Sequence, residues 1–297
     1  MFQWLKEWLG DQLCELLHPG KGFKELVRRL DVKIEALRSV DKSYNQFSIP
    51  KKNGSPRQIS APNNDLKKLQ RRILRRLLNR LPIARQATGF RKGVSFVDNA
   101  RSHQNQKIAI KNDLVDFFPS ISSTSVYGYF IRIGWSRPVA KLRAGLLCHD
   151  DRLPQDAPTS PAVSNLVAFS LDLELGRISQ SKGGVYTRYA DDITISFNTQ
   201  PEDLNRFIGY CFNTIGKLGF TPHVGKNFSV RRFYRRQMVT GLVVNQKAQL
   251  PRETRRWLRA VEHRIQVIKD GDVLGNRPTL SHNQLEGWKS LQEMISR

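Results

Sequence analysis

Hydrophobic and polar residues alternate with a period of two over residues 193–197, and residues 185–190 and 107–113 are also predicted to be short strands. This alternation is typical of strands that bury one face. Only Asp191 and Asp192 separate residues 185–190 from residues 193–197, so we expect an antiparallel hairpin with the two aspartates at its tip.

Most of the remaining chain has apolar residues at helical spacing. A second hairpin is expected over residues 44–62, where Asn53-Gly54 is a strong turn signal, although such turns are also commonplace. Helices are expected at 2–17, 22–30, 32–40, 66–81, 123–133, 138–148, 160–176, 203–218, 251–270 and 279–295. The pattern therefore predicts an α+β fold, with a small antiparallel sheet flanked by helices.

A third aspartate upstream could join the paired aspartates in one cluster. Asp191-Asp192 alone would be explained by an acidic turn, since Asp is common in turns. Asp113, however, ends the strand predicted at 107–113, and the three carboxylates could form one cluster. Adjacent carboxylates repel unless cations neutralise them. Carboxylate oxygens suit Mg²⁺, and two such ions can activate a 3′-hydroxyl and stabilise a leaving pyrophosphate.

The charge of the chain points to a polyanionic partner. Its 297 residues include 49 Lys and Arg against 26 Asp and Glu, a formal net charge of +23. The basic residues gather at 67–76, 231–236 and 252–256, which favours nucleic acid as the partner. The basic face of the helix predicted at 66–81 could follow a phosphate backbone, and a solvated surface would explain it as well.

The cysteines indicate a reducing compartment. Cys14, Cys148 and Cys211 are odd in number, far apart and without zinc-site spacing, so we expect free thiols in a cytoplasmic protein. Cys148-His149-Asp150 is typical of a helix end. No apolar run is long enough to span a bilayer, and the helix predicted at 2–17 is expected to pack on the protein's own core rather than on a membrane.

The segments around the aspartates resemble the palm of reverse transcriptases. Tyr189-Ala-Asp-Asp192 matches the family's signature hairpin, and residues 113–121 match its first metal-binding strand. The resemblance implies a right-hand polymerase that copies RNA into DNA from dNTPs, with two Mg²⁺ ions bound by Asp113, Asp191 and Asp192. It also implies fingers with N-terminal helices at about 1–105, a palm at 106–237 and a thumb at 238–297.

Further residues match positions that handle the nucleotide in this family. The resemblance implies that Lys51 (or Lys52, which the sequence does not separate from it) and Arg57 hold the triphosphate. Phe118 would exclude a ribose 2′-hydroxyl, although a core aromatic is the alternative. Because successive strand residues face opposite ways, Phe117 and Phe118 should differ in role.

Two more matches lie farther along the chain. Gln155 matches the loop that grips template and nucleotide, but Asp156 stands where the family has glycine. Glycine allows close backbone approach, so this departure puts the loop's usual geometry in doubt. Lys226 occupies the place of a lysine that protonates departing pyrophosphate. A solvated surface lysine would explain it equally well.

Two short patterns narrow the resemblance to the retron branch of bacterial reverse transcriptases. These are Asn99-Ala-x-x-His103, which a capped helix start would also explain, and Val239-Thr240-Gly241. With Arg255, Arg256 and Arg259 on the helix at 251–270, they are the residues expected to contact RNA, the helix reading a duplex by shape and backbone.

Retron membership implies specific partners. It implies a cognate structured non-coding RNA (msr-msd), priming from an internal guanosine 2′-hydroxyl, an RNA–DNA product (msDNA), and an effector protein in defence against phage. The alternatives are another small bacterial reverse transcriptase, intron-derived or of the abortive-infection type, and a non-catalytic RNA-binding scaffold. An intact aspartate trio argues against the scaffold.

Overall fold

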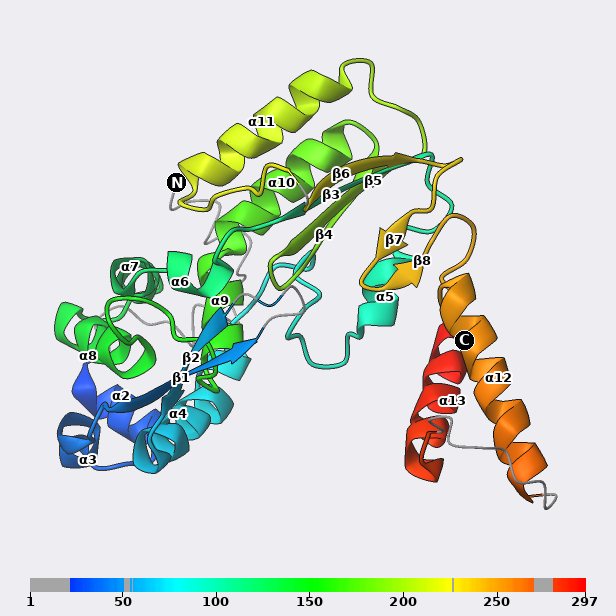
Figure 1. Cartoon of the computed structure of the whole chain (residues 1–297). Helices are drawn as coiled ribbons and strands as arrows, with labels where there is room; N and C mark the ends of the chain where they lie inside the picture. The colour runs from blue at the N-terminus through cyan, green and yellow to red at the C-terminus, as the bar shows by residue number, and fades with distance from the viewer. Residues whose placement is uncertain (1–21, 51–53, 55, 226, 270–279) are drawn as a thin grey trace.

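The computed structural model describes residues 22–50, 54, 56–225, 227–269 and 280–297. Its centre is a four-stranded antiparallel sheet in the order β4-β5-β3-β6 (Figure 1). These strands are β3 (Ile108–Asp113), β4 (Gly184–Tyr189), β5 (Asp192–Phe197) and β6 (Phe228–Arg232). The three strands predicted at 107–113, 185–190 and 193–197 are thus confirmed, and β4 and β5 form the predicted hairpin.

The two faces of this sheet differ in chemistry. Ile110, Ile193 and Ile195 point to one face and are at most 4% exposed. That face packs on α10 (Phe169–Ser181) and α11 (Leu204–Lys217), which lie together along one side of the sheet (Figure 1). The opposite face carries polar and charged side chains. Burial of the first face fixes the register, because a slip of one residue would exchange the two faces.

The N-terminal part of the described chain lies beyond the end of the sheet that carries the Asp191–Asp192 turn (Figure 1). Strands β1 (Tyr44–Pro50) and β2 (Pro56–Pro62) form the second predicted hairpin. Around it lie α2 (Phe23–Leu30), α3 (Ile34–Ser39), α4 (Asn64–Arg76), α6 (Phe117–Ser120), α7 (Ser123–Arg132), α8 (Arg137–Leu147) and α9 (Ser160–Val167).

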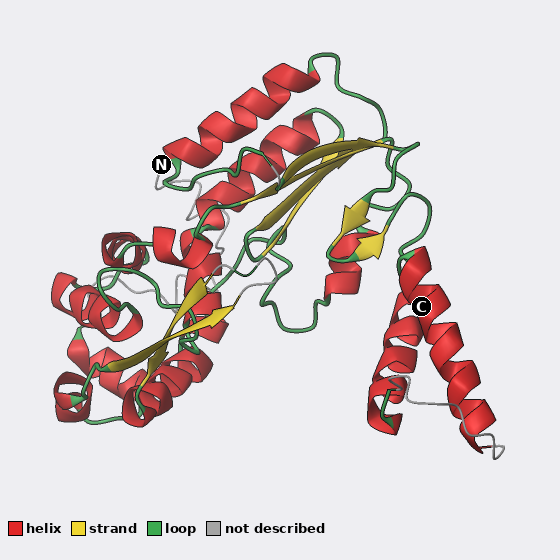
Figure 2. Ribbon diagram, viewed as in Figure 1, coloured by secondary structure: helices red, strands yellow, loops and turns green. Residues whose placement is uncertain are grey.

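A second, smaller core joins α5 (Phe96–Arg101) to the C-terminal elements. It contains Val97 and Ala100 of α5, together with Val239 and Leu242. The last two belong to β7 (Met238–Val239) and β8 (Leu242–Val243). Helices α12 (Arg252–Lys269) and α13 (His282–Ser296) pack against the same core and lie side by side, away from the N-terminal helices (Figure 2).

Two helix predictions were wrong in their bounds. The helix predicted at 66–81 ends at Arg76, and a short 3₁₀ helix, Leu78–Arg80, follows. Leu77 and Leu78 are both buried, and Leu77 has φ −129°, outside the α-helical range, where the α-helix gives way to the tighter 3₁₀ turn. The helix predicted at 160–176 is two helices, α9 and α10, divided at Ala168.

Two further predictions concern thiols and membranes. Cys148 and Cys211 are buried and free, as expected. In the described ranges, none of the helices combines the length and apolar composition needed to cross a bilayer. The helix predicted at 2–17 and Cys14 lie outside the described residues.

Asp156 has a backbone conformation that favours glycine. Its φ is +104° and the residue is exposed. A non-glycine residue there is strained, because its Cβ crowds the neighbouring backbone. The aspartate that departs from the family's glycine therefore keeps a glycine-like conformation, in the loop that leads to α9.

Asp156→Gly should raise the free energy of unfolding by about 1 kcal/mol, because the relieved strain exceeds the entropy that a new glycine adds to the unfolded chain. Urea denaturation measures this change. Asp156→Ala is the matched control, since it removes the charge and keeps Cβ. If Asp156→Ala raised the free energy of unfolding as much as Asp156→Gly, the gain would come from loss of the charge and not from relief of backbone strain.

Candidate active site

Three aspartates meet at the end of the sheet. Asp113 is the last residue of β3 and lies directly opposite Asp192, the first residue of β5. Asp191 precedes it in the turn, and its carbonyl accepts a hydrogen bond of 2.9 Å from the backbone N–H of Leu114. The sheet register thus brings together Asp113 and Asp192, which are 79 positions apart in the sequence.

The cluster is electrostatically unfavourable without cations. Burial, and then the charges of Asp192 and Asp191, raise the pKa of Asp113 to about 6. Burial also raises the pKa of Asp192, against the opposing effect of Lys111. Lys111 Nζ lies 2.8 Å from Asp192 Oδ2. The sequence analysis missed this lysine, although its position two residues before Asp113 on the same strand face could have indicated it.

The residues of the turn fit a divalent cation. Within the described ranges, His, Cys, Asp and Glu side chains do not gather in threes as a ready-made metal site. Asp192 Oδ1, however, is buried and has no hydrogen-bond partner. A buried carboxylate oxygen without a partner is costly, and a hard cation would satisfy it. Lys111 pairs with Asp192, and Lys111 and His223 also lower the pKa of Asp113, but burial and the neighbouring aspartates outweigh them there.

Phe117 and Phe118 differ in burial. They belong to helix α6 and not to a strand, so the alternation argument was wrong. Phe117 is 3% exposed in the core, whereas Phe118 is half-buried. The ring of Phe118 lies 6.0 Å from that of Phe90, which is 47% exposed and has a φ of +59°. The sequence analysis did not single out Phe90.

The other nucleotide candidates are only partly placed. Arg57 is exposed near the start of β2, next to the hairpin turn. Gln155 is half-buried in the loop before α9. Lys51, Lys52 and Lys226 lie outside the described residues. The structure therefore does not bring Arg57, Gln155 and the aspartates into direct contact.

Asn99 and His103 are buried, so the prediction that they contact RNA directly is wrong for this conformation. They are 1% and 0% exposed. His103 forms two hydrogen bonds of 2.7 Å, Nδ1 with Ser196 Oγ and Nε2 with Thr187 Oγ1. Thr88 Oγ1 donates to Asn99 Oδ1 at 2.7 Å. His103 therefore links β4 to β5 on their polar face, and Asn99 accepts from Thr88, which also bonds to the carbonyl of Arg188 in β4.

Of the Val239-Thr240-Gly241 pattern, Val239 ends β7, and Thr240 and Gly241 form the turn that follows. Thr240 and Gly241 have φ of +45° and +85° between β7 and β8, which fits a two-residue hairpin turn. Val239 is fully buried, which excludes direct RNA contact. Thr240 Oγ1 donates to the carbonyl of Phe96 in α5 at 2.7 Å. The two patterns that suggested a retron enzyme therefore pack against each other, although about 140 residues separate them.

The arginines of α12 lie on the solvent side of that helix. Arg255, Arg256 and Arg259 are exposed, whereas Leu258 and Val261 are buried. At 100° per residue the three arginines span one side of the helix, opposite the buried side. This arrangement agrees with the predicted basic face.

The family model for "Reverse transcriptase (RNA-dependent DNA polymerase)" matches residues 49–232, which include the whole aspartate cluster. The retron Ec86 reverse transcriptase of Escherichia coli is 33% identical over 273 residues, covering 89% of this chain and 84% of that protein. This chain belongs to the retron-type reverse transcriptases. The resemblance inferred from the sequence motifs is thereby confirmed.

Other retron-type relatives are longer. The retron Mx65 reverse transcriptase of Myxococcus xanthus is 36% identical over 255 residues, covering 80% of this chain and 59% of that protein. The retron Mx162 reverse transcriptase of the same organism is 35% identical over 284 residues, covering 84% of this chain and 57% of that protein. This reverse transcriptase thus spans about three fifths of the length of these two relatives.

The burial of His103 predicts an acid-sensitive fold. Burial lowers its pKa from 6.5 to about 3. Between these values the unfolded chain binds one proton more than the folded chain, so stability present above pH 6.5 is lost as the pH falls. From pH 6.5 to pH 5 the contribution of His103 to stability should fall by about 2 kcal/mol, whereas the raised pKa of Asp113 acts in the opposite direction.

Urea denaturation at several pH values tests this linkage. His103→Gln cannot titrate, so its free energy of unfolding should change with pH less steeply by the same amount. His263→Gln, on the exposed side of α12, is the matched control and should follow the wild type. Parallel curves for the wild type and His103→Gln would contradict the linkage.

Proposed function

We propose that this protein is an RNA-directed DNA polymerase that uses Mg²⁺ and dNTPs. The observation that carries the proposal is the placement of Asp113 opposite Asp192, beside Asp191, on the polar side of the sheet in a reverse transcriptase. The partnerless Asp192 Oδ1 and the raised pKa of Asp113 support cation binding at this place.

The carboxylates of Asp113, Asp191 and Asp192 would hold two Mg²⁺ ions. When bound, such ions activate the attacking hydroxyl and stabilise charge on the transferred phosphoryl group. The protein holds the three carboxylates at fixed positions through the β3–β5 register, and the Leu114 N–H holds the Asp191 carbonyl. The buried sheet beneath them excludes water from one side.

The nucleotide candidates act around this cluster in the proposal. Arg57 and Lys51 would bind the triphosphate, where cations stabilise negative charge. Phe118 would close the sugar site against a 2′-hydroxyl, Gln155 would contact the nucleotide, and Lys226 would protonate the leaving pyrophosphate. The half-buried position of Phe118, in contrast to the buried Phe117, supports the choice between the two rings.

A right-hand polymerase layout completes the proposal, with fingers at 1–105, palm at 106–237 and thumb at 238–297. The exposed arginines of α12 support a thumb that follows a duplex by its phosphates and 2′-hydroxyls. Thr240 and the exposed Gly241 lie at a hairpin turn near the same core, where they could contact RNA.

The retron-type relatives support a more specific role in the bacterial cytoplasm. The enzyme would bind its own structured non-coding RNA (msr-msd), start DNA from an internal guanosine 2′-hydroxyl, and leave an RNA–DNA product (msDNA). It would act with an effector protein in defence against phage. The relatives' names carry the retron assignment alone, and the remaining steps rest on the family resemblance.

Asp191→Asn combined with Asp192→Asn should abolish DNA synthesis, with a loss of at least about 1000-fold, because several kcal/mol of metal-dependent stabilisation disappear. RNA binding should remain near the wild-type level, since the carboxylates do not contact the RNA backbone. A dNTP incorporation assay and a filter-binding assay measure the two properties. Residual synthesis near the wild-type rate would remove these aspartates from the metal site.

Phe118→Ala should raise the ratio of ribonucleotide to deoxyribonucleotide incorporation by about tenfold or more, because the side chain that meets the 2′-hydroxyl is gone; tenfold corresponds to about 1.4 kcal/mol. Single-nucleotide extension with each rNTP and dNTP measures the ratio. Phe117→Leu is the matched control and should lower stability without changing the ratio. If only the Phe117 variant changes discrimination, the two roles are reversed.

Neutralising Arg255, Arg256 and Arg259 with glutamine should weaken RNA binding and lower the slope of log affinity against log salt by about 0.7–0.9 per lost phosphate contact. Priming from the 2′-hydroxyl should fail before extension of an annealed primer does, because only priming needs the whole RNA docked. The exposed Lys182, which follows the end of α10, and Arg206 and Lys217 of α11 provide a control triple of equal charge. Equal effects of both triples would show that net charge alone binds the RNA.

A further inference from the structure

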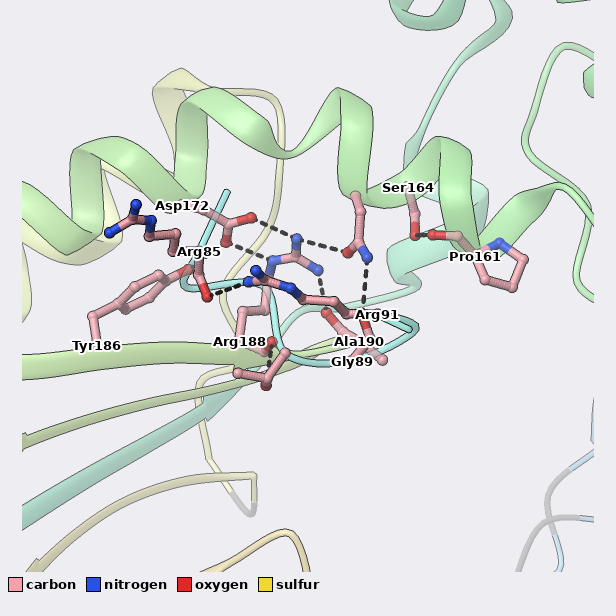
Figure 3. A network of polar contacts seen from close by, with 11 residues as sticks. Arg85, Gly89, Arg91, Pro161, Ser164, Asp172, Tyr186, Arg188 and Ala190 are labelled. Carbon is pink, nitrogen blue, oxygen red and sulfur yellow. Dashed lines mark hydrogen bonds and ion pairs between the residues drawn. The ribbon is translucent and has the colours of Figure 1, made fainter. Parts of the chain in front are cut away.

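Behind the Asp191–Asp192 turn lies a buried ion pair that none of the site assignments uses. Arg188 of β4 and Asp172 of α10 are both fully buried. Arg188 Nε donates to Asp172 Oδ1 at 2.7 Å, and Arg188 Nη2 donates to Asp172 Oδ2 at 2.6 Å (Figure 3). Such a bidentate pair fixes the plane and position of the guanidinium group.

The remaining guanidinium nitrogen holds the turn itself. Arg188 Nη1 donates to the carbonyl of Ala190 at 2.8 Å (Figure 3). Ala190 has a φ of +58°, a conformation that is unfavourable for a residue with a Cβ. Asp191 and Asp192 follow immediately, so the direction of both carboxylates depends on this strained residue. The guanidinium group is a rigid donor that reaches the turn from the core side of the sheet.

The same guanidinium group is connected to the segment that carries Phe90. Arg188 Nη2 also donates to Asn165 Oδ1 at 3.1 Å, and Asn165 Nδ2 donates to the carbonyl of Gly89 at 2.9 Å. Gly89 lies directly on the turn, since a Cβ at this position would come within 2.5 Å of the Ala190 nitrogen. The residue after Gly89 is Phe90, whose ring faces Phe118.

Arg188 is therefore linked to three parts of the candidate site, to two of them directly and to the third through Asn165. These parts are the turn with Asp191 and Asp192, helix α9 that follows the Gln155 loop, and the Gly89–Phe90 segment beside Phe118. The guanidinium carbon also lies 5.2 Å from the centre of the Phe117 ring.

We propose that Arg188, fixed by Asp172 and linked to Gly89 through Asn165, is a positioning residue for the polymerase reaction. It sets the place of the Asp191–Asp192 turn relative to the Phe90–Phe118 pair, and so couples the rate of nucleotide addition to sugar selection. This inference rests on the proposed polymerase function.

Three variants separate positioning from simple stabilisation. Arg188→Lys keeps the charge but lacks the planar set of donors that reaches Asp172, Asn165 and Ala190 together. Asn165→Ala keeps the Arg188–Asp172 pair and cuts the link to Gly89. Tyr186→Phe is the matched control, because it removes the Tyr186 hydroxyl that donates to Asp172 Oδ1 at 2.9 Å and leaves the turn contacts intact.

Each variant is compared with the wild type at a temperature where circular dichroism shows it folded. The measurements are kcat and KM for one dNTP, the rNTP-to-dNTP ratio, and Mn²⁺ affinity from the electron paramagnetic resonance signal of free Mn²⁺. Arg188→Lys should lower kcat by about 10- to 100-fold, the effect of a small misplacement of reacting groups, and weaken Mn²⁺ binding. Asn165→Ala should change the rNTP-to-dNTP ratio, and Tyr186→Phe should change none of these properties.

The outcomes distinguish this inference from the proposed function. A wild-type protein that incorporates no dNTP in Mg²⁺ refutes the polymerase function. An active wild type with folded variants that lose only melting temperature refutes positioning by Arg188. If Arg188→Lys does not fold, Asn165→Ala decides the matter through its rNTP-to-dNTP ratio, because it leaves the buried ion pair complete, and an unchanged ratio would refute positioning by Arg188.

Discussion

Three carboxylates that repel one another are held together at one end of an antiparallel sheet, and the rest of the structure serves this constraint. The register of β3 and β5 sets Asp113 opposite Asp192. Burial of Ile110, Ile193 and Ile195 on the other face secures that register against α10 and α11. The energy that packs the apolar face therefore opposes the repulsion on the polar side.

The polar face is organised by residues that the sequence patterns had suggested as RNA contacts. His103 bonds to both strands of the hairpin, and Asn99 bonds to Thr88 beside β4. Thr240 ties the β7–β8 turn to α5. In this retron-type enzyme the two motifs thus connect the sheet to the C-terminal helices.

The sequence was sufficient for features that depend on local periodicity. The β4–β5 hairpin, the position of Asp113 at a strand end and the basic face of α12 all follow from alternation or helical spacing within about twenty residues. Features that depend on distant contacts were beyond it. Arg188 pairs with Asp172 on another element, the burial of His103 needs both β4 and β5, and the φ of Asp156 is set by the fold of its loop. Lys111 could have been predicted to lie on the same strand face as Asp113, because strand alternation places it there, but its ion pair with Asp192 depends on the pairing of β3 with β5.

Purification of the protein together with the RNA that it binds, followed by addition of labelled dNTPs with Mg²⁺ or with EDTA, tests the central claim most directly. The account predicts label in a DNA strand attached to RNA, formed only with Mg²⁺ and shifted in mobility by ribonuclease. Tight RNA binding by the wild-type protein without any incorporation, on the bound RNA or on an annealed primer–template, would contradict it and leave an RNA-binding scaffold.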